Sequence, residues 1–413
     1  MIPRMSTQGT HDRRQFLQST LAGIGTAAIP MPVSADDYIE PSMTTPGRPF
    51  TAYGMPSGFE HVQRLLSPPG PWPVTGVSFT PIESLEGIIT PSGLHFERHH
   101  NGVADIDPKL HRLMIHGLVK TPLEFSMDAL LRYPRVSAIH FVECAGNSGA
   151  NAGPEPMQGS AGAIHGLVSC SEWSGVPLGR LLDEAGVLPE GQWILAEGAD
   201  AASMSRSIPL AEAHEQAILA LYQNGERLRP EQGYPLRLLM PGWEGNLNVK
   251  WLHRVKVTAG PTMTKDETSK YTQSLKNGRA LQFNLILPVK SVITRPSGTM
   301  TMNGPGYYEI SGIAWSGHGK IEQVEVSMDG GHSWSRTELV APVLPQCLTR
   351  FRLPWEWDGT PAVLQSRATD ERGNVQPTRT AWKAPFSEVQ FYHYNAIQSW
   401  RVSADNSVKN VYV

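Results

Sequence analysis

The chain has 413 residues, enough for two or three domains at the usual size of about 150 residues each. Charged residues make up 18% of the chain and hydrophobic residues 40%, a composition that argues against intrinsic disorder. The formal net charge of −3 excludes a strongly basic nucleic-acid binder, and three cysteines are too few for a disulfide framework. The 39 glycines and 34 prolines exceed the usual share and favour turns and short strands over helix bundles.

The N-terminal residues predict an export signal. Arg13 and Arg14 form a twin-arginine pattern, a mildly apolar run without acidic residues follows, and Val33 and Ala35 are small enough for cleavage. The run is shorter than the ~18–20 residues that a membrane span needs, and no other stretch qualifies. Residues 1–35 are therefore interpreted as a Tat signal peptide, which predicts a folded chain exported to the periplasm. The alternative is a disordered arm with a chance arginine pair.

Two domains are expected after this segment. Residues 36–80 are rich in Pro, Gly and Ser, which predicts an extended lead-in on the surface, with ordered structure beginning near Pro81. From 81 to 283 helix and strand patterns mix, which indicates an α+β domain. The expected strands lie at 113–119, 138–142 and 249–257, and the expected helices at 127–133 after Ser126 and at 178–185 between Pro177 and Gly186.

A different pattern covers residues 284–413. Short alternating runs at 307–315, 321–328 and 362–368 are separated by turn residues, and no helical pattern lies between them. Strands at such spacing predict an all-β sandwich of immunoglobulin type.

Cys144 is the residue that points most clearly to chemistry. It ends an apolar strand in the run Phe141-Val-Glu-Cys-Ala-Gly-Asn147, where Gly146 and Asn147 permit a tight turn. Such a turn would expose the sulfur to a pocket, and thiolates are ligands for soft metals. The alternative, from position alone, is a buried and inert cysteine.

Basic side chains gather at other strand and loop ends. Arg98 lies between Phe96-Glu97 and His99-His100, and further basic residues follow at Arg237, Lys250, His253 and Arg254. A bound phosphate would use such donors, arginine especially because of its forked geometry. Adjacent histidines point to different sides of a strand, so this pair does not suggest a two-histidine metal site, and a surface pair is the alternative.

Taken in order, these segments resemble the sulfite oxidase family of molybdenum-cofactor enzymes from about residue 90 to the C-terminus. The Cys-Ala-Gly-Asn run is similar to the family's cysteine loop, and Lys270-Tyr271 falls where the family keeps its active-site tyrosine. Further segments similar to the family's cofactor strands and dimerisation domain are 96–100, 171–178, 197–200, 234–237, 248–252, 315–317, 326–331 and 373–377.

The resemblance implies a molybdopterin-binding domain over 81–283 and an immunoglobulin-like dimerisation domain over 284–413. It implies molybdenum with molybdopterin as the cofactor and Cys144 as the metal ligand. The implied cofactor-binding residues are Phe96, Glu97, Arg98, His99, His100, Cys144, Asp200, Gln232, Arg237, Asn248, Val249 and Lys250. The implied catalytic residues are Cys144, Arg98, Tyr271 and His393. A packed tyrosine and an aromatic-cluster histidine are the alternatives for Tyr271 and His393.

The departures from the family concern charge. Ser148-Gly149 stands where the animal and plant enzymes continue the cysteine loop with basic residues, and His393 stands where another substrate arginine is usual. Gln232 replaces a cofactor-contacting histidine, whereas Arg98 is kept. Because a small dianion such as sulfite is best held by several fixed cations, the pocket is expected to suit another substrate, and Gly149→Arg is expected to improve sulfite oxidation.

One branch of the family shares these features: the sulfane dehydrogenase molybdenum subunits of bacterial sulfur-oxidising (Sox) systems. The branch implies oxidation of sulfane sulfur on a carrier protein and a separate c-type cytochrome as electron acceptor, and the sequence holds no Cys-x-x-Cys-His haem motif of its own. A homodimer, or a heterotetramer with the cytochrome, is expected, with Trp355 and Trp357 as exposed contacts. Neither binding to nucleic acid nor a membrane span is expected. The rivals are a periplasmic sulfite dehydrogenase, a methionine-sulfoxide-type reductase and a cofactor-free binding protein.

Overall fold

The computed structural model describes residues 40–67, 75–387 and 391–413. The chain divides into two units, residues 1–61, of which the structure describes 40–61, and residues 62–413. In the first, the described residues form the short 3-10 helix η2 (Pro41–Met43) and otherwise run exposed, without strand pairing. The predicted signal peptide, 1–35, lies outside the described residues.

Ordered pairing in the second unit begins before Pro81, the start expected from composition. Strand β2 (Gly76–Phe79) joins β1 (Leu65–Leu66) and β3 (Glu97–His99) in an antiparallel sheet. The register sets Val77 opposite Arg98, so β2 supplies the backbone partner that holds the 96–100 segment in place. The high proline and glycine content of the preceding residues concealed this strand.

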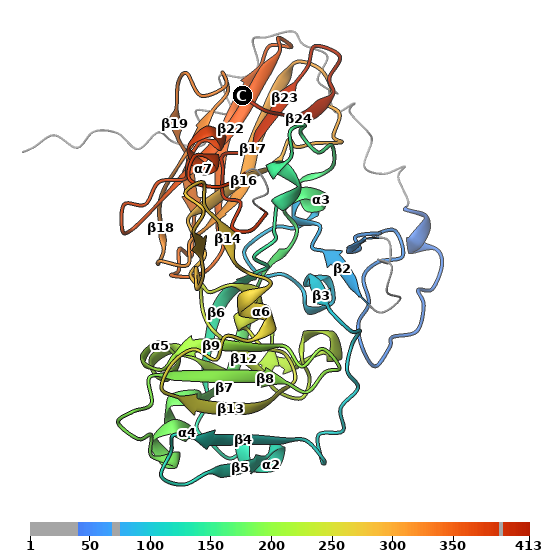
Figure 1. Ribbon diagram of the computed structural model, residues 1–413. Coiled ribbons are helices and arrows are strands. Elements are labelled where there is room, and N and C mark those ends of the chain that lie inside the picture. The colour runs from blue at the N-terminus through green and yellow to red at the C-terminus, as the bar shows by residue number, and fades with distance from the viewer. Residues whose placement is uncertain (1–39, 68–74, 388–390) are drawn as a thin grey trace, which may run out of the picture. The chain divides into compact units, whose positions relative to one another are not determined.

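Two five-stranded sheets form the body of the α+β domain (Figure 1). The first has the order β11-β10-β7-β6 with β12 also on β10, and consists of β6 (Val136–Glu143), β7 (Val168–Pro177), β10 (Ile218–Gln223), β11 (Glu226–Arg227) and β12 (Arg237–Leu239). The second has the order β5-β4-β13-β8-β9, and consists of β4 (Arg112–Gly117), β5 (Leu123–Ser126), β8 (Trp193–Gly198), β9 (Ser205–Pro209) and β13 (Leu252–Thr258). Strand β13 is parallel to β4 and antiparallel to β8.

Local sequence signals account for the helices. In α4 (Leu178–Ala185) the leucines and Ala185 are buried, and Gly186 ends the helix in the left-handed region at φ +67°, as predicted. The side chain of Ser126 caps α2 (Met127–Leu130), which ends three residues before the predicted Tyr133. The other short helices are η3 (Ile82–Ser84), η4 (Ser92–Leu94), η5 (Gly149–Ala152), α3 (Ala161–His165), α5 (Leu210–Gln216), η6 (Pro230–Gln232), η7 (Gly245–Leu247), α6 (Lys265–Thr268) and α7 (Arg379–Lys383).

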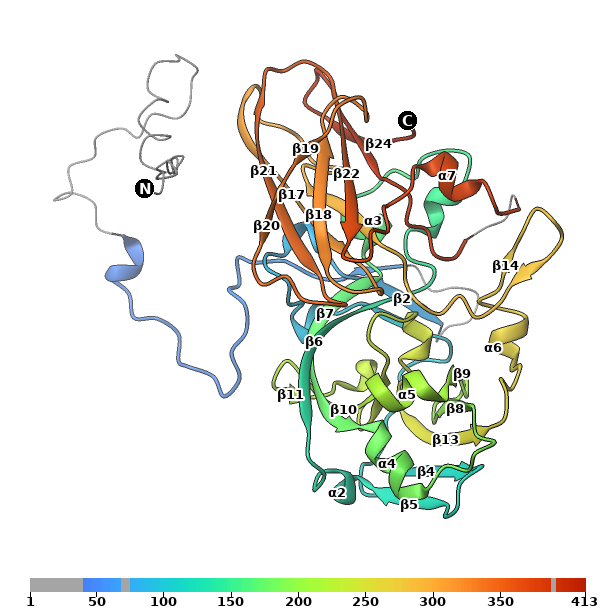
Figure 2. The same ribbon diagram turned by 90° about the vertical axis from the view of Figure 1, so that its left-hand side faces the viewer.

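A β-sandwich follows the small hairpin of β14 (Gln273–Ser274) and β15 (Ala280–Leu281) (Figure 2). One antiparallel sheet, β16-β17-β21-β20, consists of β16 (Lys290–Arg295), β17 (Gly306–Trp315), β20 (Glu338–Val340) and β21 (Thr349–Trp357). The other, β19-β18-β22-β23-β24, consists of β18 (Ile321–Ser327), β19 (Ser335–Arg336), β22 (Ala362–Asp370), β23 (Ser399–Val402) and β24 (Val408–Val411). The predicted fold class, an α+β domain followed by a sandwich, is confirmed.

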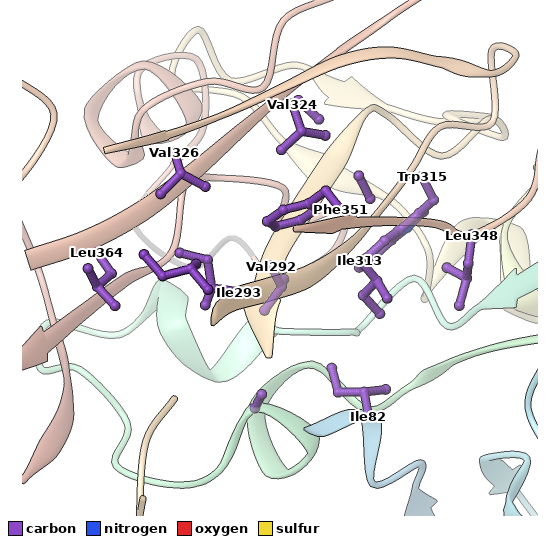
Figure 3. Packing of buried hydrophobic residues seen from close by; sticks show 14 of the residues in the cluster. Ile82, Val292, Ile293, Ile313, Trp315, Val324, Val326, Leu348, Phe351 and Leu364 are labelled. Atoms are coloured by element: carbon purple, nitrogen blue, oxygen red, sulfur yellow. The ribbon is translucent and has the colours of Figure 1, made fainter. Parts of the chain in front are cut away.

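The hydrophobic core of the sandwich continues into the α+β domain. Figure 3 shows Phe351, Val324 and Leu364 packed between the two sheets, with Ile82 of η3 on the same cluster. Burial of this apolar surface, at about 25 cal/mol per Å², stabilises the junction between the domains.

Two tryptophans expected at a dimer contact belong to this core instead. Trp355 is 7% exposed and Trp357 is 2% exposed, and both rings contact Tyr308. They stand at alternate positions of β21, so both side chains point to one face of the strand, and that face is the buried one. The expectation that they are exposed is therefore wrong.

Two cysteines meet at the same junction. Cys170 of β7 and Cys347, just before β21, are buried free thiols with their sulfur atoms 3.4 Å apart. Across the described residues, no helix combines the length and hydropathy that a membrane crossing requires.

Candidate functional site

Cys144 follows the last residue of β6, in a loop that is held at both ends. Its backbone N–H donates to the Leu167 carbonyl at 2.9 Å, and its own carbonyl accepts from the Asn147 N–H at 2.9 Å. The Asn147 side chain donates to Glu143 and accepts from the Leu167 N–H. The loop thus presents the sulfur to a cavity, while burial raises the pKa of the Cys144 thiol.

The cavity beside Cys144 encloses about 690 Å³ of empty space, a figure that includes its open mouth. Its lining comes from β3, the 198–204 turn, η6, β12, the 245–251 segment and the residues after α6. The lining side chains are His95, Phe96, Arg98, His99, His100, Val142, Cys144, Asp200, Met204, Gln232, Arg237, Asn246, Asn248, Val249, Lys250, Trp251 and Tyr271.

Most site residues expected from the sequence therefore meet at one place. Phe96, Arg98, His99, His100, Cys144, Asp200, Gln232, Arg237, Asn248, Val249, Lys250 and Tyr271 all line the cavity. Glu97 and His393 do not. Glu97 instead pairs with Arg64 and bonds the Nε2 of His99 at 2.7 Å, which orients that ring.

The inner part of the cavity concentrates positive charge. Arg237 is 4% exposed, and burial lowers its pKa to about 9. Lys250 has its pKa lowered well below the usual value, first by burial and then by the charge of Arg237. Asp200 raises that pKa, and one of its carboxylate oxygens is buried without a hydrogen-bond partner. Two buried cations in one cavity supply the charge-assisted donors that a phosphate group takes.

The neutral donors of the cavity are fixed by hydrogen bonds. Lys250 Nζ lies 2.9 Å from His99 Nδ1, so His99 accepts there and donates from Nε2 to Glu97. Burial lowers the pKa of His99 to about 3, which keeps the ring neutral. Gln232 donates to the Phe96 carbonyl at 3.1 Å and accepts from Arg237 at 3.1 Å, and thereby orients the guanidinium.

Tyr271 closes the cavity near Cys144. Its backbone lies in the left-handed region at φ +50°, and its ring packs on the Arg206 guanidinium at 5.0 Å and on Tyr392 at 5.3 Å. Burial raises the pKa of Tyr271 well above its usual value, so the phenol stays protonated and can donate a hydrogen bond.

His393 lies behind the cysteine loop, away from the main cavity. Its backbone N–H donates to Ala145 O at 2.8 Å, and its Nε2 lies 2.5 Å from Glu244 Oε1. Burial alone would raise the pKa of Glu244, but the hydrogen bond and charge of His393, with Arg206, lower it. His393 is thus engaged by a buried carboxylate.

The position at which Gly149→Arg was expected to improve sulfite oxidation is crowded. A Cβ at Gly149 would lie 2.6 Å from the Phe391 carbonyl oxygen and 2.7 Å from its ring, and one at Gly146 would lie 2.7 Å from the same ring. Phe391 itself is 51% exposed. The expectation that Gly149→Arg adds a cation to the site is therefore not supported by the packing.

Several site residues were not expected from the sequence. Arg206 and Glu244 are buried and join Tyr271 to His393, and His95, Asn246 and Trp251 line the cavity. Arg206 and Glu244 lie 38 residues apart, and no local pattern marks such a contact, whereas His95 and Asn246 lie beside the predicted segments 96–100 and 248–252 and Trp251 lies within the second. Trp251 has one local peculiarity, a φ of +53°, but sequence does not reveal it.

The residues present fit a molybdopterin cofactor. The Nε of Arg237 and Oδ1 of Asp200 are buried and lack hydrogen-bond partners, so the cavity has a donor and an acceptor to offer an incoming polar group. Arg237 and Lys250 supply charge for a phosphate, and Cys144, which lines the same cavity, supplies a soft metal ligand.

Comparisons with known proteins agree with this geometry. Residues 100–266 match the family model of the oxidoreductase molybdopterin binding domain, and residues 282–399 match that of the Mo-co oxidoreductase dimerisation domain. Sulfite oxidase of Gallus gallus is 31% identical over 72% of this chain and 70% of its own length. Nitrate reductase [NAD(P)H] of Hordeum vulgare is 31% identical over 72% of this chain, which spans 38% of that enzyme.

A solved structure is also similar over nearly the whole chain. The sulfane dehydrogenase SoxCD from Paracoccus pantotrophus matches with a TM-score of 0.87 and 45% identity, over 91% of this chain and 97% of the other.

Proposed function

Since the chain belongs to the sulfite oxidase family of molybdopterin oxidoreductases, we propose that it oxidises sulfane sulfur carried on a partner protein. The observation that carries the proposal is the likeness to the Paracoccus pantotrophus sulfane dehydrogenase, 45% identical over 91% of the chain.

The charges near Cys144 support a substrate other than a small free dianion. Arg98 lines the cavity, and its charge offsets part of the rise that burial gives to the pKa of Cys144. Ser148 is bonded to Lys290 and His165, and His393 to Glu244, so neither position offers a charge to the cavity. Two fewer charge-assisted hydrogen bonds, at about 1.5–3 kcal/mol each, weaken binding of a small anion by about two orders of magnitude or more.

The roles of the chain's own groups follow from their places. When bound, the cofactor supplies oxygen-atom transfer to sulfur and accepts two electrons. Arg98 orients anionic oxygens of the substrate and stabilises developing charge. Tyr271, protonated at neutral pH, donates a hydrogen bond into the reaction space. The buried lining of Val142 and Phe96 keeps bulk water from the inner cavity.

The electron acceptor, in this proposal, is a c-type cytochrome partner, because the sequence carries no Cys-x-x-Cys-His motif of its own. The twin-arginine pattern supports action in the periplasm. The match of residues 282–399 to a dimerisation domain supports a homodimer, or a heterotetramer that includes the cytochrome.

The test compares two substrates for the purified, cofactor-loaded chain with cytochrome c as acceptor. We expect kcat/KM to be at least a hundredfold higher for carrier protein loaded with sulfane sulfur than for free sulfite. Carrier whose cysteine has been alkylated is the matched control and should give no reduction of the cytochrome. Efficient oxidation of free sulfite, with no gain from the loaded carrier, contradicts the proposal.

A sulfite dehydrogenase is the second candidate. It is favoured by the likeness to chicken sulfite oxidase, of which the chain spans 70%, and by the place of Arg98 in the cavity. The same experiment separates the two, because sulfite would then be oxidised with a KM in the low micromolar range.

A further inference from the structure

A lysine of the sandwich domain reaches into the base of the cysteine loop. Lys290, the first residue of β16, is 2% exposed. Its Nζ lies 3.1 Å from Glu143 Oε1 and 2.8 Å from Ser148 Oγ. Glu143 directly precedes Cys144 and Ser148 follows four residues later, so one ammonium group joins the two ends of the loop.

Both of these partners are held further within the protein. The other oxygen of Glu143 accepts from Trp315 Nε1 at 2.6 Å, and Oε1 also accepts from Asn147 at 2.9 Å. The Lys290 ammonium lies 5.4 Å from the centre of the Trp315 ring. Since Trp315 and Lys290 both belong to the sandwich, the carboxylate next to Cys144 is anchored in the second domain.

Ser148 needs such support because its backbone is in the left-handed region, at φ +65°. Its hydroxyl accepts from Lys290 and lies 2.6 Å from His165 Nδ1. Burial, and then the Lys290 charge, lower the pKa of His165, so the ring is neutral and can accept at Nδ1. His165 Nε2 then donates to the side-chain oxygen of Gln398 at 3.0 Å. Each group in the series from Lys290 to Gln398 therefore donates to the next one.

We propose that Lys290 is a positioning residue for Cys144, so that the sandwich domain fixes the direction in which the cysteine loop presents its sulfur. The ammonium spans the loop from Glu143 to Ser148 and leaves Cys144 as the side chain that turns to the cavity. This role does not depend on which sulfur compound is oxidised.

The test measures how fast Cys144 of the full-length, cofactor-free chain reacts with iodoacetamide under native conditions. Cys170 and Cys347 are 0% and 1% exposed, so the reaction reports Cys144, and Cys144→Ser gives the background. In Lys290→Met the loop loses both contacts, and we expect labelling at least tenfold faster. Ser148→Ala loses one contact and should label at an intermediate rate.

A matched control separates positioning from stability. Arg350 is another buried cation of the sandwich, 3% exposed, but it bonds the carbonyls of Leu85 and Gly87. Arg350→Met should lower the melting temperature and leave the labelling rate of Cys144 unchanged. As a second readout, molybdenum should dissociate faster from loaded Lys290→Met than from loaded Arg350→Met during dialysis.

The double variant Glu143→Gln/Lys290→Met leaves no unpaired buried charge and serves if the single variant does not fold. The inference stands if the variant lacking Lys290 labels at least tenfold faster than wild type. It is overturned if that variant melts at a lower temperature but labels Cys144 at the wild-type rate, because Lys290 would then act on stability alone.

Discussion

Replacing Gly149 by alanine tests how closely the C-terminal segment packs on the cysteine loop. The new Cβ would lie 2.6 Å from the Phe391 carbonyl oxygen and 2.7 Å from two ring carbons. The half-exposed ring can turn away, but the carbonyl belongs to the backbone that places His393 on Ala145 through a 2.8 Å hydrogen bond. The segment must therefore shift by several tenths of an ångström, at an expected loss of about 1–3 kcal/mol in the free energy of unfolding.

Urea denaturation followed by tryptophan fluorescence measures this loss, with Gly153→Ala as the control. A Cβ at Gly153 would have its nearest neighbour at 3.5 Å, an ordinary contact, and the residue has a φ of −62°. We expect Gly153→Ala to be neutral or more stable by up to about 1 kcal/mol. If Gly149→Ala is as stable as Gly153→Ala, Phe391 does not cover the loop. The expectation that Gly149→Arg improves sulfite oxidation would then stand again.

Three further outcomes follow from the charges of the site. Arg237→Met should lower the molybdenum content of the purified chain at least tenfold. Arg254, grouped with Arg237 from the sequence, pairs with Glu197 and does not line the cavity, so Arg254→Met should leave the content unchanged. Equal metal contents in the two variants would contradict the phosphate role of Arg237. Glu244→Gln removes a buried carboxylate from both His393 and Arg206. The free energy of unfolding in urea should fall by about 3–5 kcal/mol, less the part that Arg206 retains through Glu267. A loss below about 1 kcal/mol would refute the ion pair of Glu244 with His393. Burial lowers the pKa of His95 to about 3 from 6.5, so below about pH 6.5 the unfolded chain binds a proton there that the folded chain does not. Stability therefore decreases as the pH is lowered, and this group should cost the cofactor-free chain about 2 kcal/mol between pH 7 and 5. A free energy of unfolding that stays constant or increases as the pH is lowered from 7 to 5 would contradict this account.

Local patterns were sufficient to predict most of the fold. The alternation in 307–315 and the apolar spacing in α4 depend on neighbours along the chain, and the structure has strands and a helix there. The buried face of each strand was harder to predict, because an alternating pattern does not say which of the two faces meets the core. Trp355 and Trp357 were therefore expected on the surface although they are buried.

The residues of the site also fall into those that local motifs reveal and those that only distant contacts bring together. Cys144 could be recognised because it follows a strand and precedes Gly146, and the ordered motifs brought the cofactor-binding residues with it. The contacts of His393 with Glu244, and of Lys290 with Glu143, join segments 149 and 147 residues apart. Sequence spacing carries no signal for such contacts, so a histidine expected to face the substrate is found engaged behind the loop.

X-ray absorption at the molybdenum edge tests the central claim, that Cys144 holds the metal in this cavity, most directly. The wild-type chain should contain molybdenum with a protein thiolate among its sulfur ligands. Cys144→Ser should lose one sulfur ligand and all turnover while keeping the wild-type free energy of unfolding, because a hard hydroxyl replaces a soft thiolate poorly. An unchanged number of sulfur ligands in Cys144→Ser, or wild-type turnover, would contradict the account.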